Sequence, residues 1–86
     1  MKRILLITFE YPTGKAYCGG VGQVVRQCRQ GLVELGHEVY VLISSEFHKK
    51  KPVKLLLPDG SIARFSNFHA FQKKYAWHAF NYIIQH

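Results

Sequence analysis

The sequence has few acidic residues, few cysteines and no long apolar run, and each shortage excludes a class of protein. Five Asp and Glu stand against twelve Lys and Arg in 86 residues, which gives a formal charge of +7 and favours acidic or phosphate-bearing partners. The two cysteines, Cys18 and Cys28, fall in an expected loop and on the buried face of an expected helix. This placement disfavours a structural disulfide and favours a cytoplasmic protein.

A membrane span and a secretion signal are also missing. The chain begins with Lys2 and Arg3 like a signal peptide, but the apolar run that follows reaches Glu10 and Pro12 before it is long enough. Internal repeats and low-complexity segments are absent, and a hydrophobic content of 48% excludes a disordered or fibrous chain. We therefore expect one small domain over residues 1–86.

The patterns of familiar cofactor and metal sites are incomplete. The Gly-Lys-Ser/Thr ending of a phosphate loop does not occur. Gly20 and Gly22 supply part of a dinucleotide fingerprint, but Val25 takes the third glycine's position and the loop 11–19 separates them from the preceding strand. No two histidines are spaced three or four apart on one helix face. We therefore expect no bound cofactor and no metal.

Nucleic acid is disfavoured because the basic residues are scattered. They occur at the N-terminus, on a helix, in a loop and near the C-terminus, and no single stripe gathers them. The run Lys49-Lys50-Lys51 is typical of a solvated loop.

The sequence does contain a clear alternation of strand and helix patterns. The apolar run 3–9 predicts a parallel strand covered on both faces. Apolar residues spaced three or four apart predict a helix over 21–35, which Gly36 ends in a left-handed cap. The run 38–44 predicts a second strand, parallel to the first.

The second half predicts a β-hairpin followed by an aromatic helix. Strands 53–57 and 61–65 are joined by an Asp-Gly turn, and Asn67 can cap a helix over 68–84. We expect its aromatic stripe to pack in the core rather than to bind sugar. Because so apolar a helix needs further cover, we expect a truncated chain that stops before its next strand and forms homo-oligomers through this helix. The predicted fold class is α/β with three layers, parallel strands, a β-hairpin and a C-terminal aromatic helix.

The segment 14–22 is the candidate binding site. Gly19, Gly20 and Gly22 lie at the entrance of the expected helix, where backbone N–H groups are available and an anion such as a diphosphate can approach closely. Tight turning alone would also account for these glycines.

Three phrases follow one another at a characteristic spacing. They are Phe9-Glu10-Tyr11-Pro12, Gly19-Gly20-Val21-Gly22 and Leu35-Gly36-His37-Glu38-Val39. Over residues 3–45 this order resembles the start of the glycosyltransferases with two facing Rossmann-like domains, especially glycogen and starch synthases and their retaining relatives. The resemblance implies that the chain is a Rossmann-like half domain, the N-terminal part of such an enzyme.

The resemblance also implies a reaction. These enzymes transfer a hexose from a nucleotide-diphosphate sugar, here an ADP- or UDP-sugar, to a glucan or other acceptor with retention of configuration. By position, Gly19, Gly20 and Gly22 would contact the diphosphate of the donor. The base pocket and the catalytic residues of the family belong to later strands and to a C-terminal domain. We therefore expect no catalytic residue in this chain and no activity from it alone.

Two positions of the glycine loop differ from the bacterial glycogen synthases, which read Lys-Thr-Gly-Gly-Leu-Gly-Asp. Tyr17 stands at the lysine position and Gln23 at the aspartate position. Lys15 lies two residues before Tyr17 and can take the lysine's place if the loop bends back.

A protein of a different class fits the same residues. The chain would then be a self-contained module that binds a nucleotide or phosphate through the glycine loop and associates with itself through the aromatic helix.

Overall fold

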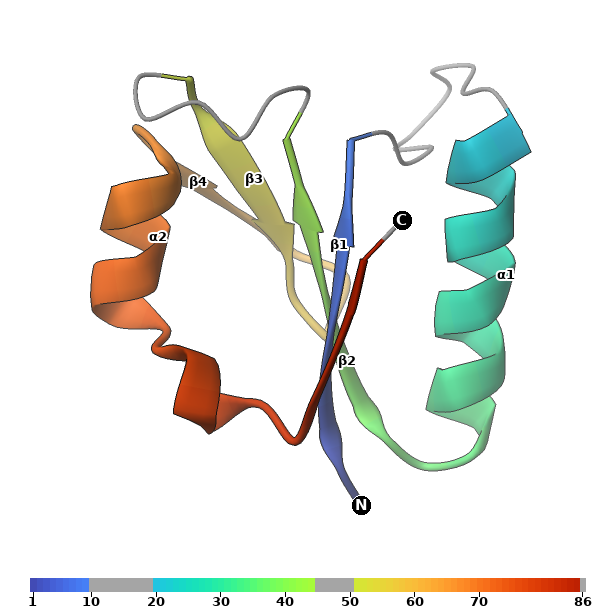
Figure 1. Ribbon diagram of the computed structural model, residues 1–86. Coiled ribbons are helices and arrows are strands. Elements are labelled where there is room, and N and C mark those ends of the chain that lie inside the picture. Colours follow the sequence, from blue (N-terminus) through green and yellow to red (C-terminus); the bar gives the residue numbers. More distant parts are fainter. Residues whose placement is uncertain (10–19, 45–50, 86) are drawn as a thin grey trace.

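The computed structural model describes residues 1–9, 20–44 and 51–85 (Figure 1). Its strands are β1 (Arg3–Thr8), β2 (Glu38–Ile43), β3 (Val53–Leu56), β4 (Ile62–Phe65) and β5 (Tyr82–Gln85). Its helices are α1 (Gly20–Glu34), α2 (Phe68–Lys74) and the 3-10 turn η1 (Trp77–Ala79). Within these residues five strands form one mixed sheet in the order β4-β3-β2-β1-β5. β1 is parallel to β2 and β5, and β3 is antiparallel to both of its neighbours.

The strand β1 lies inside the sheet and is covered on both faces. Ile4 and Leu6 belong to the core cluster beneath α1, whereas Leu5 and Ile7 belong to the cluster beneath α2. Figure 1 shows the two helices on opposite sides of the sheet. The strand that the apolar run predicted is confirmed, and the architecture is α/β with three layers.

The helix predicted over 21–35 is confirmed as α1, and a Schellman motif ends it. The N–H of Gly36 donates to the carbonyl of Val33 at 2.9 Å, and the N–H of His37 donates to the carbonyl of Leu32 at 3.2 Å. Gly36 has φ +89°, in the left-handed region that favours glycine. The chain thus reverses from α1 directly into β2.

The predicted hairpin is confirmed, with β3 and β4 pairing antiparallel. The Asp59 carboxylate accepts hydrogen bonds from the Ser61 hydroxyl at 2.6 Å and from the Ser61 N–H at 2.9 Å. These bonds lower the pKa of Asp59, the hydroxyl contributing most. Gly60 has φ +91° and completes the turn.

The prediction of a long C-terminal helix over 68–84 is wrong. Asn67 caps a helix as predicted, its Oδ1 accepting from the N–H of Ala70 at 2.8 Å, but this helix ends at Lys74. The turn η1 and then β5 follow. The Tyr-Ile-Ile of β5 favours an extended backbone, and β5 hydrogen-bonds to the free edge of β1. Residues 82–85 are therefore a strand of the sheet and not the last turn of a helix.

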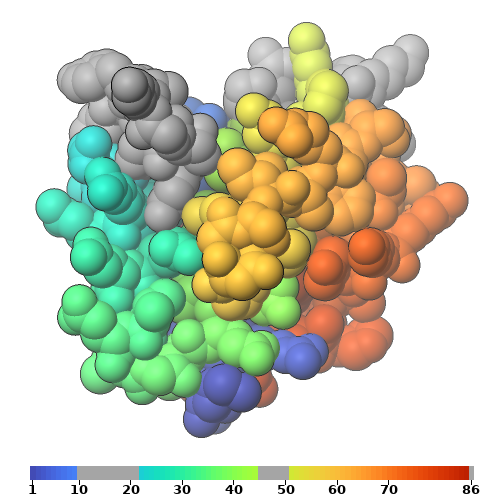
Figure 2. Space-filling view, turned by 180° about the vertical axis from the view of Figure 1, so that it is seen from behind, coloured from blue at the N-terminus to red at the C-terminus, as the bar shows by residue number. Residues whose placement is uncertain are grey.

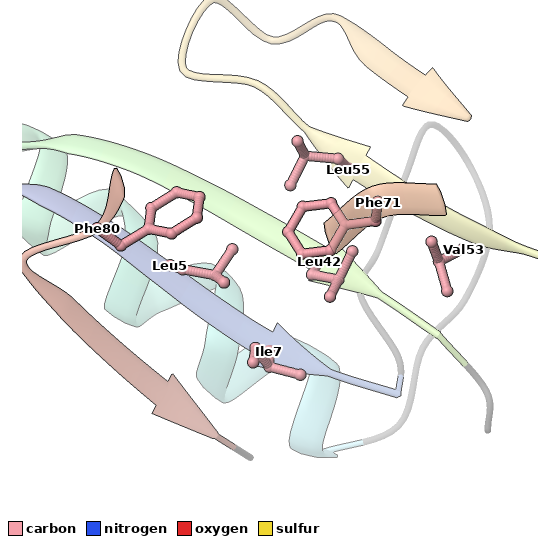
Figure 3. Packing of buried hydrophobic residues seen from close by; sticks show 7 residues of the cluster. All are labelled: Leu5, Ile7, Leu42, Val53, Leu55, Phe71 and Phe80. Atoms are coloured by element: carbon pink, nitrogen blue, oxygen red, sulfur yellow. The ribbon is translucent and has the colours of Figure 1, made fainter. Parts of the chain in front are cut away.

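The aromatic residues of the second half pack on the sheet face opposite α1 (Figure 3). Phe71 is fully buried, with its ring centroid 5.7 Å from those of Phe65 and Tyr75. Phe80 meets Tyr40 edge to face at 5.4 Å. These rings form the core on this side, as the sequence predicted for the aromatic stripe.

Two glycine substitutions in and after α1 should change stability in opposite directions. An added Cβ at Gly36 or at Gly31 would have no atom within 4 Å, so backbone conformation alone decides the outcome. Gly36→Ala forces alanine into a left-handed conformation and should lower the free energy of unfolding by about 1–2 kcal/mol. Gly31→Ala, inside the helix, should raise it by about 0.5–1 kcal/mol. Urea denaturation measures both changes, and two shifts of the same sign would contradict this account.

Truncating Phe71 should have a large effect because the ring fills the centre of one core cluster. Phe71→Ala is expected to lower the free energy of unfolding by about 3–5 kcal/mol. Val24→Ala, at a half-exposed position on α1, should change it by no more than about 0.5 kcal/mol. Equal losses in the two variants, measured by chemical denaturation, would show that Phe71 does not hold this layer together.

Candidate functional site

The parallel strands β1, β2 and β5 end at one edge of the sheet, here called the carboxyl edge. Thr8 ends β1 and Ser44 follows β2, and both side chains are buried. The N–H of Ser44 donates to the carbonyl of Thr8 at 3.0 Å, which continues the pairing of the two strands to this edge. Figure 1 shows the first turn of α1 on the same side of the molecule.

The connections that lead into the two neighbours of β1 cross opposite faces of the sheet. Helix α1 covers one face and leads to β2, whereas α2 covers the other face and leads to β5. β1 therefore has neighbours on its two sides that are reached over different faces of the sheet. In open α/β sheets the crevice outside the carboxyl ends of such strands is where ligands bind.

The glycine loop predicted as the binding site is only partly within the described residues. Lys15 and Gly19 lie outside them. Gly20 is the first residue of α1, and Gly22 is buried in the first turn. That turn has no acidic side chain, so no carboxylate on it opposes an anion near the helix N-terminus. The contact of these residues with a diphosphate stays a prediction.

The phrase Leu35 to Val39 lies at the opposite edge of the sheet, where it has a structural role. The Nδ1 atom of His37 accepts from the N–H of Lys2 at 3.2 Å, and the N–H of Glu38 donates to the carbonyl of Lys2 at 2.9 Å. The guanidinium Nε of Arg3 is 3.0 Å from Oε2 of Glu38. These contacts fasten the end of α1 to the starts of β1 and β2.

The displaced pKa values of Tyr40 and Asp59 belong to groups away from the carboxyl edge. Burial raises the pKa of Tyr40, and the charge of Glu38 raises it further. Asp59 lies in the hairpin turn, which is at the other end of the sheet because β3 runs antiparallel to β2. Neither group adds acid or base chemistry to the carboxyl edge.

Sequence reasoning missed two basic residues near this edge, Lys54 of β3 and Arg64 of β4. They are partners in the strand register, so their side chains stand on one face of the sheet. The alternation of polar and apolar residues in the hairpin was a usable signal, but which face they share depends on the tertiary arrangement.

The described residues contain neither a cluster that could bind a metal ion nor a helix that could span a membrane. No group of three or more His, Cys, Asp and Glu in residues 1–9, 20–44 and 51–85 is arranged to hold a metal ion. Within the same ranges no helix has the length and apolar character that crossing a membrane requires. Cys28 has a free thiol and packs, partly buried, against the cluster beneath α1.

Comparison with known proteins gives no match to a family model, a curated protein or a solved structure. A functional assignment for this chain therefore rests on its residues and their arrangement.

Proposed function

We propose that this chain is the N-terminal, Rossmann-like half domain of a retaining glycosyltransferase similar to glycogen and starch synthases. Its role is to hold the diphosphate of an ADP- or UDP-sugar while a hexose is transferred to a glucan or other acceptor. The observation that carries the proposal is the start of α1 at Gly20, at the carboxyl edge beside β1 and directly after the glycine loop. A diphosphate placed there would meet the backbone N–H groups of the first helical turn and the positive end of the helix dipole.

Two further observations support the proposal. The neighbours of β1, β2 on one side and β5 on the other, are reached over opposite faces, which is the arrangement that opens a nucleotide crevice in doubly wound folds. The formal charge of +7 favours a doubly charged anionic donor. The acid and base groups that sugar transfer needs are expected in a second domain. This chain therefore binds the donor without catalysing the transfer.

Titration with ADP-glucose and UDP-glucose tests the proposal. We expect saturable binding of at least one donor, followed by calorimetry or amide chemical shifts, with no sugar transfer. Lys15→Ala and Gly20→Val should each weaken binding about tenfold, the effect of losing one charge-assisted contact or the close approach of phosphate.

Two matched variants control this titration. Lys74→Ala removes the same charge from α2 on the far face, and Gly31→Ala adds a methyl group to the same helix away from its start. Both should bind the donor as the unmodified chain does. Absence of saturable binding, or transfer catalysed by this chain alone, would refute the proposal.

A self-associating module is a second candidate, and the exposed edge of β5 favours it. Tyr82 and Ile83 are 55% and 40% exposed, on opposite faces of a strand that carries no charged residue. Uncharged edge strands readily pair with another chain. Association would then use β5 and not the aromatic helix, whose Phe71 is buried.

Light scattering over a range of concentrations tests self-association. We expect a dimer that Ile83→Lys converts to monomer, because a charge on an edge strand opposes pairing. Val24→Lys, at a half-exposed position on α1, serves as the charge-matched control and should leave the dimer intact. A monomer at high concentration would exclude this candidate.

A further inference from the structure

A row of side chains crosses the α1 face of the sheet next to the carboxyl edge. The strand registers pair Arg64 with Lys54, Lys54 with Ile43, and Ile43 with Thr8. Residues directly opposite in a sheet point to the same face. Lys54 and Arg64 therefore stand side by side, and both are exposed.

Neighbouring residues fix the face that these two cations share. Leu56 and Ile62, each two positions away along its strand, pack in the core cluster beneath α1. Side chains two apart in a strand share a face and are about 7 Å apart. Lys54 and Arg64 thus continue the α1 face beyond the part that the apolar residues cover.

Helix α1 adds a third cation on the same face of the sheet, farther from the carboxyl edge, because Arg29 is nine residues, or about 13.5 Å of helix rise, after Gly20. Arg29 follows the buried Val25 by four residues, so it lies beside the inward stripe of the helix. In a right-handed β1–α1–β2 crossover, the flank of α1 that carries Arg26 and Arg29 faces the β3–β4 hairpin rather than β5. Figure 2 shows α1, in cyan to green, directly beside β4, in gold.

These cations lack partners within the described part of the chain. The Nε atom of Arg29 is buried and has no hydrogen-bond acceptor there. Lys54 and Arg64 form no ion pair with described residues, whereas Arg3 and Glu38 do so at the other edge. A buried donor without an acceptor and two like charges side by side are each unfavourable. An anion between them would relieve both.

We propose that Arg29, Lys54 and Arg64 form a binding site for the phosphate group of a small phosphorylated ligand. The guanidinium forks supply paired N–H donors that match phosphate oxygens, and Lys54 supplies a further charge. A small ligand fits better than nucleic acid because Lys73 and Lys74 lie on α2, across the sheet, and do not extend the cluster. The site lies on the flank of α1 and is independent of the proposed donor site at its start.

Inorganic phosphate and pyrophosphate are the probes for this site, with binding followed by NMR. We expect saturable binding that shifts the Nε–H signal of Arg29. The double variant K54Q/R64Q and the single variant R29Q should each weaken binding about tenfold or more. K73Q/K74Q removes two charges from the opposite face and should change the affinity less than about twofold.

A further variant separates a loss of phosphate binding from a loss of folding. R29K keeps the charge but lacks the Nε–H donor, and it should also weaken binding if it unfolds at the same temperature as the unmodified chain. Equal losses in K73Q/K74Q and K54Q/R64Q, or binding that never saturates, would overturn the proposal. Tighter binding of a single-stranded oligonucleotide that also requires Lys73 and Lys74 would overturn it in favour of a nucleic-acid surface.

The donor site can be separated from this one in the same experiment. Lys15→Ala and Gly20→Val should leave phosphate binding at Arg29 unchanged. Loss of phosphate binding in those two variants alone would place the anion at the glycine loop, which overturns this inference and leaves the proposed function standing.

Discussion

The structure depends on the burial of β1 on every side. Its backbone pairs with β2 on one edge and β5 on the other, and its side chains from Ile4 to Ile7 alternate between two core clusters. A strand without a solvent-facing side must be apolar at each position, and a helix must cover each face. The positions of α1 and α2 on opposite faces follow from this requirement (Figure 1).

The end of the sheet at which β1 and β2 begin is held together by several hydrogen bonds. There the Nδ1 atom of His37 and the Oδ1 atom of Asn81 accept hydrogen bonds from the backbone N–H groups of Lys2 and Arg3, and Arg3 pairs with Glu38. At the carboxyl edge the first turn of α1 has no acidic side chain, and a helix supplies no acceptors of its own for the N–H groups of that turn. The contacts among the strand starts stabilise the fold, and the proposed anionic ligand would bind at the carboxyl edge.

Part of the excess positive charge is brought to one face of the sheet only when the chain folds. Along the sequence Arg29, Lys54 and Arg64 are separated by 25 and 10 positions and form no motif. The antiparallel register places two of them side by side, and the helix crossover brings the third to the same face. Other cations, such as Lys73 and Lys74, lie on the helix across the sheet.

Local patterns in the sequence determined β1, α1, β2 and the hairpin. Each depends on residues close together, such as the helical spacing before Gly36 or the Asp59-Gly60 turn. The same reasoning predicted the helix from residue 21, one position after its first residue Gly20, and the role of the glycine loop stays a prediction. Tertiary structure decided that residues 82–85 form a strand, because the free edge of β1 offered backbone partners about 78 residues away. It also decided that Lys54 and Arg64 share the face of α1, since register and crossover depend on how distant segments pack.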